Sequence, residues 1–114
     1  MSTNVWLKCG RVYNLLSEDA PPSGDVTGPW VYKDSPLTTF HATLLGVGAL
    51  SATVTIQVSA DGVTAVSTVL GVITLSGTNT VADGFAATAS WKYVRAVVSA
   101  TTGTVTSVSV DMGV

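Results

Sequence analysis

Aliphatic and polar residues alternate along much of the chain with a period of two. In segments 52–59 and 107–112 every second residue is Ala, Val, Ile or Met, and the residues between them are polar. Successive side chains of a β-strand point to opposite faces, so this period predicts strands with one buried face. The positions expected in the core are Val54, Ile56, Val58, Val94, Ala96, Val98, Val108 and Val110.

The same pattern, bounded by turn-forming residues, predicts seven strands. Turn signals containing Asp, Asn or Gly fall at residues 60–62, 76–79, 82–84 and 101–103. Val105 is out of phase with the strand that follows it, which predicts a β-bulge or the start of a strand near Thr106. The predicted strands cover residues 26–33, 37–45, 52–59, 64–75 with a break at Gly71, 84–89, 91–98 and 104–112.

One predicted strand, 91–98, carries large side chains on both faces. Its aliphatic face is expected to join the core, and the opposite face, with Trp91, Tyr93 and Arg95, is expected to be partly covered. An arginine placed between aromatic residues can stack on a ring and keep its donors for a carboxylate or a carbonyl.

The chain divides into three parts. Residues 1–19 are expected to form an N-terminal arm or an edge strand of the same domain, and both alternatives are open. Residues 20–25 contain two consecutive prolines and a glycine, which predicts a turn or linker. Residues 26–114 are expected to form one β-sandwich domain, because 114 residues suffice for a single core.

Composition supports an all-β fold. Val, Thr and Ser supply 48 of the 114 residues, and the β-branched Val and Thr disfavour helix and suit strands. Charged residues make up only 11%, against about a quarter in an ordinary soluble domain. Between Ser35 and Ser90 the only formal charges are Asp61 and Asp83. Such a surface is either covered by other protein or kept soluble by Ser and Thr, and composition does not decide between the two.

Several function classes are not expected. A net charge of −2 offers no basic patch for nucleic acid. No apolar run is long enough to span a membrane, and the first ten residues lack the pattern of a secretory signal. Cys9 is the only cysteine, which excludes an internal disulfide and is compatible with a reducing compartment. We expect Cys9 to be a small buried hydrophobe.

No catalytic, metal or cofactor site is predicted. His41 is the only histidine, so a histidine-based metal cluster cannot form, and no local motif links it to Cys9. Asp61 and Asp83 precede glycines, where an aspartate side chain bonds its own backbone in a turn. Residues 46–48 (Gly-Val-Gly) lack the lysine and helix of a phosphate-binding loop. We therefore expect a protein that is not an enzyme.

Aromatic and basic residues of the N-terminal third are the candidates for partner binding. Trp and Arg contribute strongly at protein interfaces. Trp30 and Tyr32 share one strand face, and they either close one end of the sandwich or form a ligand platform. The candidate interface residues are Trp6, Lys8, Arg11, Tyr13, Trp30 and Tyr32.

The segments 52–62 (ATVTIQVSADG), 91–98 (WKYVRAVV) and 103–110 (GTVTSVSV) resemble strands of small jelly-roll domains. The chain is similar in this respect to galactose-binding-like sandwiches and to small structural proteins of tailed bacteriophages, notably capsid decoration (cement) proteins. Galactose-binding-like modules often have a Trp shortly after the Asp-Gly turn, whereas this chain continues Val63-Thr64-Ala65-Val66. No sugar-binding residue of that family maps onto this chain.

The resemblance implies a jelly-roll-like antiparallel β-sandwich and a virion structural role. The expected function is that of a decoration protein that binds the major capsid protein and stabilises the shell, without a cofactor, nucleic acid or membrane. A homo-oligomer on the capsid surface, assembled in the host cytoplasm, is expected. The alternatives are a carbohydrate- or receptor-binding module of a tail or fibre, and a tail-completion protein.

Overall fold

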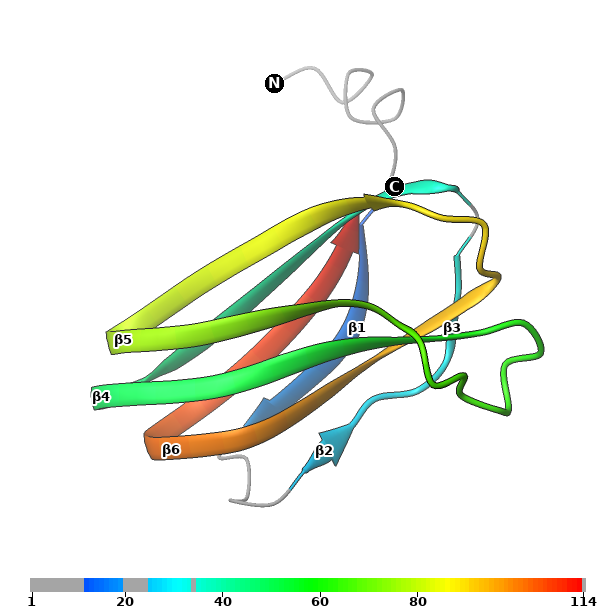
Figure 1. Cartoon of the computed structure of the whole chain (residues 1–114). Helices are drawn as coiled ribbons and strands as arrows, with labels where there is room; N and C mark the ends of the chain where they lie inside the picture. Colours follow the sequence, from blue (N-terminus) through cyan, green and yellow to red (C-terminus); the bar gives the residue numbers. More distant parts are fainter. Residues whose placement is uncertain (1–11, 20–24, 34, 114) are drawn as a thin grey trace.

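Six antiparallel strands form the fold, three of which are unusually long (Figure 1). This computed structural model describes residues 12–19, 25–33 and 35–113. All regular elements of these residues are strands, which confirms the predicted all-β class. The strands are β1 (Val12–Asp19), β2 (Val26–Thr27), β3 (Val31–Tyr32), β4 (Leu37–Ser59), β5 (Val69–Thr88) and β6 (Tyr93–Gly113).

Each long strand bends near its middle and contributes to both layers of a sandwich (Figure 1). The bends contain residues with positive φ: Gly48 at 77° in β4, Asn79 at 66° in β5 and Gly103 at 92° in β6. Glycine adopts such angles without strain, and asparagine does so more readily than most residues. Since β4 pairs with both β5 and β6, the three bends lie side by side.

Side chains and close backbone packing hold the three bends together. The Gly48 amide donates to Oδ1 of Asn79 at 2.8 Å, which joins β4 to β5. The hydroxyls of Ser51 and Thr102 share a hydrogen bond that joins β4 to β6. A Cβ at Gly103 would collide with the carbonyl oxygen of Ala49, so this position requires glycine for space as well as for its φ.

The strand order is that of a jelly roll. One layer has the order β1–β6–β4–β5, built from the later parts of β5 and β6 and the first part of β4. The other layer has β2 and β3 at its edge, followed by β6, β4 and β5. The order in which successive strand segments enter the two layers is that of a jelly roll with eight strand segments. The predicted jelly-roll-like sandwich is thus confirmed.

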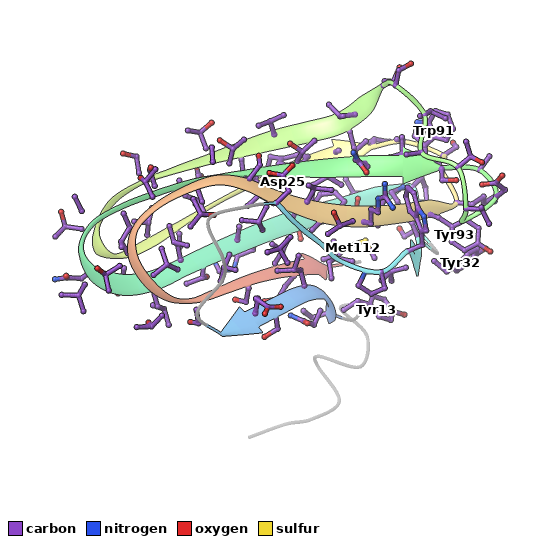
Figure 2. All side chains as sticks on the ribbon, turned by 90° about the horizontal axis from the view of Figure 1, so that it is seen from below. Tyr13, Asp25, Tyr32, Trp91, Tyr93 and Met112 are labelled. Atoms are coloured by element: carbon purple, nitrogen blue, oxygen red, sulfur yellow. The ribbon has the colours of Figure 1, made fainter. Side chains whose placement is uncertain are left out.

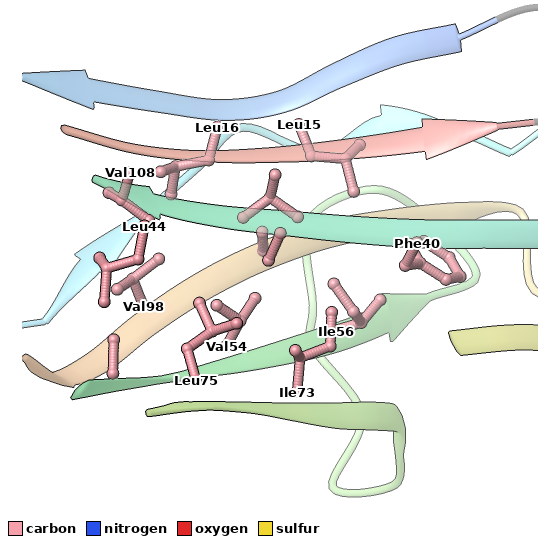
Figure 3. Close-up of a cluster of buried hydrophobic side chains, with 14 of the residues drawn as sticks. Leu15, Leu16, Phe40, Leu44, Val54, Ile56, Ile73, Leu75, Val98 and Val108 are labelled. Carbon is pink, nitrogen blue, oxygen red and sulfur yellow. The ribbon is translucent and has the colours of Figure 1, made fainter. Parts of the chain in front are cut away.

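The core lies between the two layers (Figure 3). All eight residues predicted for it are buried, and Met112 is buried with them. Phe40 and Phe85 stack with ring centroids 5.1 Å apart, and the Phe85 ring lies against Gly71, which has no side chain to displace it. The molecule is 19 Å across its shortest axis, which agrees with two sheets packed about 10 Å apart.

Several predicted strand boundaries are wrong. The turn signals at 76–79 and 101–103 are bends inside β5 and β6, and residues 82–84 continue β5, paired with β4. Strands 37–45 and 52–59 are one strand, and 26–33 contains two separate pairs of residues. Residues 64–68 precede β5. The turn at 60–62 is confirmed, and so is the bulge, because Leu45 pairs with Ser107 while Gly46 pairs with Val105.

Residues 12–19 belong to the sandwich as edge strand β1. They pair with β6, with a register shift between Asn14 and Leu16. Leu15 and Leu16 are both buried in the core, since the irregularity turns two consecutive side chains inward. This part of the predicted arm is therefore an edge strand, and residues 1–11 and 20–24 lie outside the described residues.

Because Ile56 lies at the centre of the core, shortening its side chain should have a large effect on the free energy of unfolding. Ile56→Ala removes buried methyl groups from the middle of β4 and should lower the free energy of unfolding by about 2–5 kcal/mol. Thr55→Ala, on the outer face of the same strand, should change it by about 1 kcal/mol or less. Urea denaturation followed by circular dichroism measures both variants. Equal effects would contradict the assigned inner face.

Candidate functional site

Cationic and aromatic side chains gather at one end of the sandwich. All three described Lys and Arg residues, Lys33, Lys92 and Arg95, lie within residues 30–33 or 91–95. The same two segments hold two tryptophans and two tyrosines. They are neighbours because β3 pairs with the start of β6, with Val31 opposite Val94. We call residues 30–33 and 91–95 the aromatic–cationic end.

Arg95 is the centre of this end. Its guanidinium carbon lies 4.4 Å from the centroid of the Trp30 ring, a cation–π arrangement. Its Nε donates to Oε1 of Gln57 at 2.6 Å. The expectation that this arginine stacks on an aromatic ring is confirmed. Within the described residues this is its one hydrogen bond, so its terminal N–H groups are available to an acceptor on a partner.

Tyr32 and Tyr93 form an aromatic pair beside Arg95. Their ring centroids are 5.6 Å apart in an edge-to-face arrangement. Tyr32 is 52% exposed although it is a large aromatic residue. Figure 2 shows Tyr32, Tyr93 and Trp91 together at this end of the molecule. The backbone at Gly62 packs against the Tyr93 ring, so the 60–62 turn supports the pair from one side.

Lys33 is buried and bound to backbone carbonyls. Its Nζ donates to the carbonyl oxygens of Ser35 at 2.8 Å, Pro36 at 3.3 Å, and Ala89. Burial lowers the pKa of the Lys33 ammonium, and the nearby Lys92 lowers it further. Three acceptors match its three N–H donors. Lys33 therefore joins the segment before β4 to the segment after β5.

An open pocket of about 170 Å³ lies over this junction. The residues that line it include Tyr32, Trp91, Lys92 and the buried Lys33. The pocket combines aromatic surface with hydroxyl and ammonium donors. Such a combination suits a small polar ligand with an apolar face.

The turn that supports Tyr93 is ordered by Asp61. Its Oδ1 accepts hydrogen bonds from the Thr64 and Val63 amides, both at 2.9 Å, and from the Ser59 hydroxyl at 2.8 Å. These bonds, the one from Thr64 first, lower the pKa of Asp61 to about 2. The turn role predicted for Asp61 is confirmed.

Three of the six predicted interface residues are described. Trp30 and Tyr32 both lie in the aromatic–cationic end, Trp30 half-buried and Tyr32 exposed. Tyr13 is on β1, opposite Met112, and packs against the core from the other layer, and Figure 2 shows it at the same end of the molecule as Tyr32. Trp6, Lys8 and Arg11 lie outside the described residues.

The site contains residues that the sequence did not assign to the interface. These are Lys33, Gln57, Trp91, Lys92, Tyr93 and Arg95. The signal for part of this group was available, because the predicted strand 91–98 begins with Trp91, Tyr93 and Arg95 on one face and Lys92 on the other. Its pairing with residues 30–33, some 60 residues earlier, follows only from the topology.

Of the pair considered for catalysis, Cys9 and His41, the structure describes His41. His41 is exposed on β4, with Asp111 as its register neighbour on β6, and Asp111 accepts a hydrogen bond from Asn14 at 2.9 Å. Among the described residues, no group of three or more His, Cys, Asp or Glu side chains could hold a metal ion. Nor do these residues include a helix able to cross a bilayer. Cys9 lies outside them.

No protein-family model matches the chain, and no curated protein matches it in sequence. In structure the chain is similar to one chain in the structure of infectious bursal disease virus, Gx strain, with a TM-score of 0.45 and 12% sequence identity. The similarity covers 91% of this chain, which spans about a third (33%) of the length of the viral chain. The jelly-roll assignment rests on the strand order given above.

Asp61 should make the fold sensitive to acid. Its pKa is depressed in the folded state, so its contribution to stability is present above 3.8, the ordinary value, and is lost as the pH falls through about 2. Wild type should melt at a higher temperature than Asp61→Ala at pH 7, and this difference should shrink between about pH 4 and pH 2.

The control is Asp61→Asn, which keeps an acceptor oxygen without the charge. Its difference in melting temperature from Asp61→Ala should stay constant over the same pH range. A wild-type advantage of the same size at pH 7 and pH 2 would show that the carboxylate does not order the turn.

Proposed function

We propose that this chain is a non-enzymatic structural protein of a virion, and that it acts as a decoration protein on the outer surface of a bacteriophage capsid. The jelly roll is a fold of viral capsid domains and of lectins, so the fold is compatible with this role and with a sugar-binding role. The choice between them depends on the surface.

The main support for this proposal is the aromatic–cationic end. Trp, Tyr and Arg are the residues that most often dominate binding energy at protein interfaces. Here Trp30 holds the Arg95 guanidinium in place, and Tyr93 supports the exposed Tyr32. A preordered arginine loses little side-chain entropy when it meets a carboxylate or carbonyl on a partner. This cluster is suited to anchoring on a protein surface such as the major capsid protein.

The surface around the cluster favours contact with protein. The outer face of β4 next to Arg95 carries Ser51, Thr53, Thr55 and Gln57, and the neighbouring β5 residues are Val72, Thr74 and Ser76. None of these residues is charged, and Val72 is 51% exposed. Free monomers normally carry mixed charges over such faces. Burial against a capsid would remove little charge from water and would cover the exposed valine.

Binding to capsids tests the proposal. Arg95→Ala and Tyr32→Ala should each weaken binding of the purified chain to undecorated capsids of its phage by about 30-fold, the effect of removing an interface contact worth about 2 kcal/mol. Co-sedimentation with capsids over a range of concentrations measures the dissociation constant. Thr39→Ala, an exposed position in the other layer, is the matched control and should bind like wild type. Unchanged binding by both site variants would reject this surface.

The pocket beside Trp91 favours a second candidate, a carbohydrate- or receptor-binding module of a tail or fibre. An aromatic wall with adjacent hydroxyl and ammonium donors suits a sugar ring. In that case Trp91→Ala should abolish binding to a glycan array while Arg95→Ala keeps it. Copy number separates the candidates further, because a decoration protein is present in hundreds of copies per particle and a tail module in a handful.

A further inference from the structure

Among the strands of the described residues, β5 is at the edge of both layers. Within the described residues it pairs with β4 along one side, and no strand pairs with its other side. An unpaired strand edge presents a row of N–H and C=O groups that can pair with another chain. Soluble proteins usually protect such edges with charges, prolines, bulges or very short strands.

Each of the other edges shows one of these protections. β1 contains Glu18 and an irregularity between Asn14 and Leu16. β2 and β3 have two residues each, and Pro29 lies between them. The later part of β5 carries Asp83, whose register partner is the buried Ala42, so this charge is on the inward side of the edge.

The first part of β5 lacks such protection. From Gly71, opposite Ile56, to Thr78, opposite Ala49, it pairs regularly with β4 and contains neither charge nor proline. An irregularity at Leu70 precedes this segment, and the positive φ of Asn79 follows it. The regularly paired, neutral edge is therefore limited to residues 71–78.

Within this edge, the sequence of segment 71–77 is close to symmetric about Thr74. It reads Gly-Val-Ile-Thr-Leu-Ser-Gly. In an antiparallel pair of two copies centred on Thr74, Gly71 lies opposite Gly77 and the buried Ile73 lies opposite Leu75. The exposed Val72 lies opposite Ser76, and Thr74 lies opposite its own copy. Each pair joins residues of the same face, so both the core and the outer surface continue across the junction.

We propose that two copies of this chain associate through residues 71–77 of β5, in an antiparallel pair around a two-fold axis at Thr74. A two-fold interface uses the same patch on both subunits and must be complementary to itself. The segment meets this condition because it brings no like charges together and because each residue lies opposite a residue of the same face. β1 does not meet it, since its pairing is interrupted by an irregularity between Asn14 and Leu16.

Dimer formation is independent of a role on capsids, so it can be measured on the purified chain without them. Sedimentation equilibrium of the purified chain should show a concentration-dependent dimer. Thr74→Lys places two ammonium groups opposite each other and should weaken the dimer at least ten-fold, with an unchanged circular dichroism spectrum. Thr80→Lys adds the same charge to an exposed position of β5 beyond the bend and should dimerise like wild type.

A mixture provides the decisive comparison. Thr74→Glu alone should also weaken the dimer at least ten-fold, whereas equal amounts of Thr74→Lys and Thr74→Glu should form a mixed dimer because opposite charges then meet across the pair. Thr74→Cys in a Cys9→Ser background should form a disulfide-linked dimer on oxidation, and Thr80→Cys in that background should not. This cross-link decides the case if the charged variants do not fold. A wild type that stays monomeric at all concentrations, or a cross-link of equal yield at residue 80, would overturn the proposal.

Discussion

Three adjacent strands pass from one layer of the sandwich to the other without a break in the chain, and the rest of the structure depends on how they do so. β4 lies between β5 and β6 in both layers, so all three must bend at the same level. A residue with positive φ in each bend makes this possible, and the Asn79 side chain and the Ser51–Thr102 pair tie the bends together. The inner faces of both layers then contribute to one hydrophobic core.

The local pattern was sufficient to predict the core. Alternation in 52–59 and 107–112 identified the buried face because the period of a strand is two, whatever its partners are. It could not identify the long strands. Asn79 and Gly103 carry the positive φ that a tight hairpin also needs. A strand that bends and a strand that ends therefore look alike in sequence, and only the pairing with β4 separates them.

The candidate site was predictable only in part for a related reason. Trp30 and Tyr32 were recognised because they are neighbours in sequence. Lys33 gave no signal, since its role depends on the Ala89 carbonyl more than fifty residues away. The stacking of Arg95 was expected, but Trp30 as its partner follows from the pairing of β3 with β6. Contacts between distant segments are properties of the topology, and a single sequence does not show them.

Continuous strands also determine how the molecule carries a load. In a sandwich whose layers are joined by flexible loops, force along one layer is resisted by side-chain packing alone, and the sheets can slide past each other. Here a pull on either layer passes into covalent backbone at three neighbouring bends. Sliding would require the bends to straighten, which would also break the Gly48–Asn79 and Ser51–Thr102 hydrogen bonds that join them. The backbone of β4, β5 and β6 thus couples the two sheets mechanically.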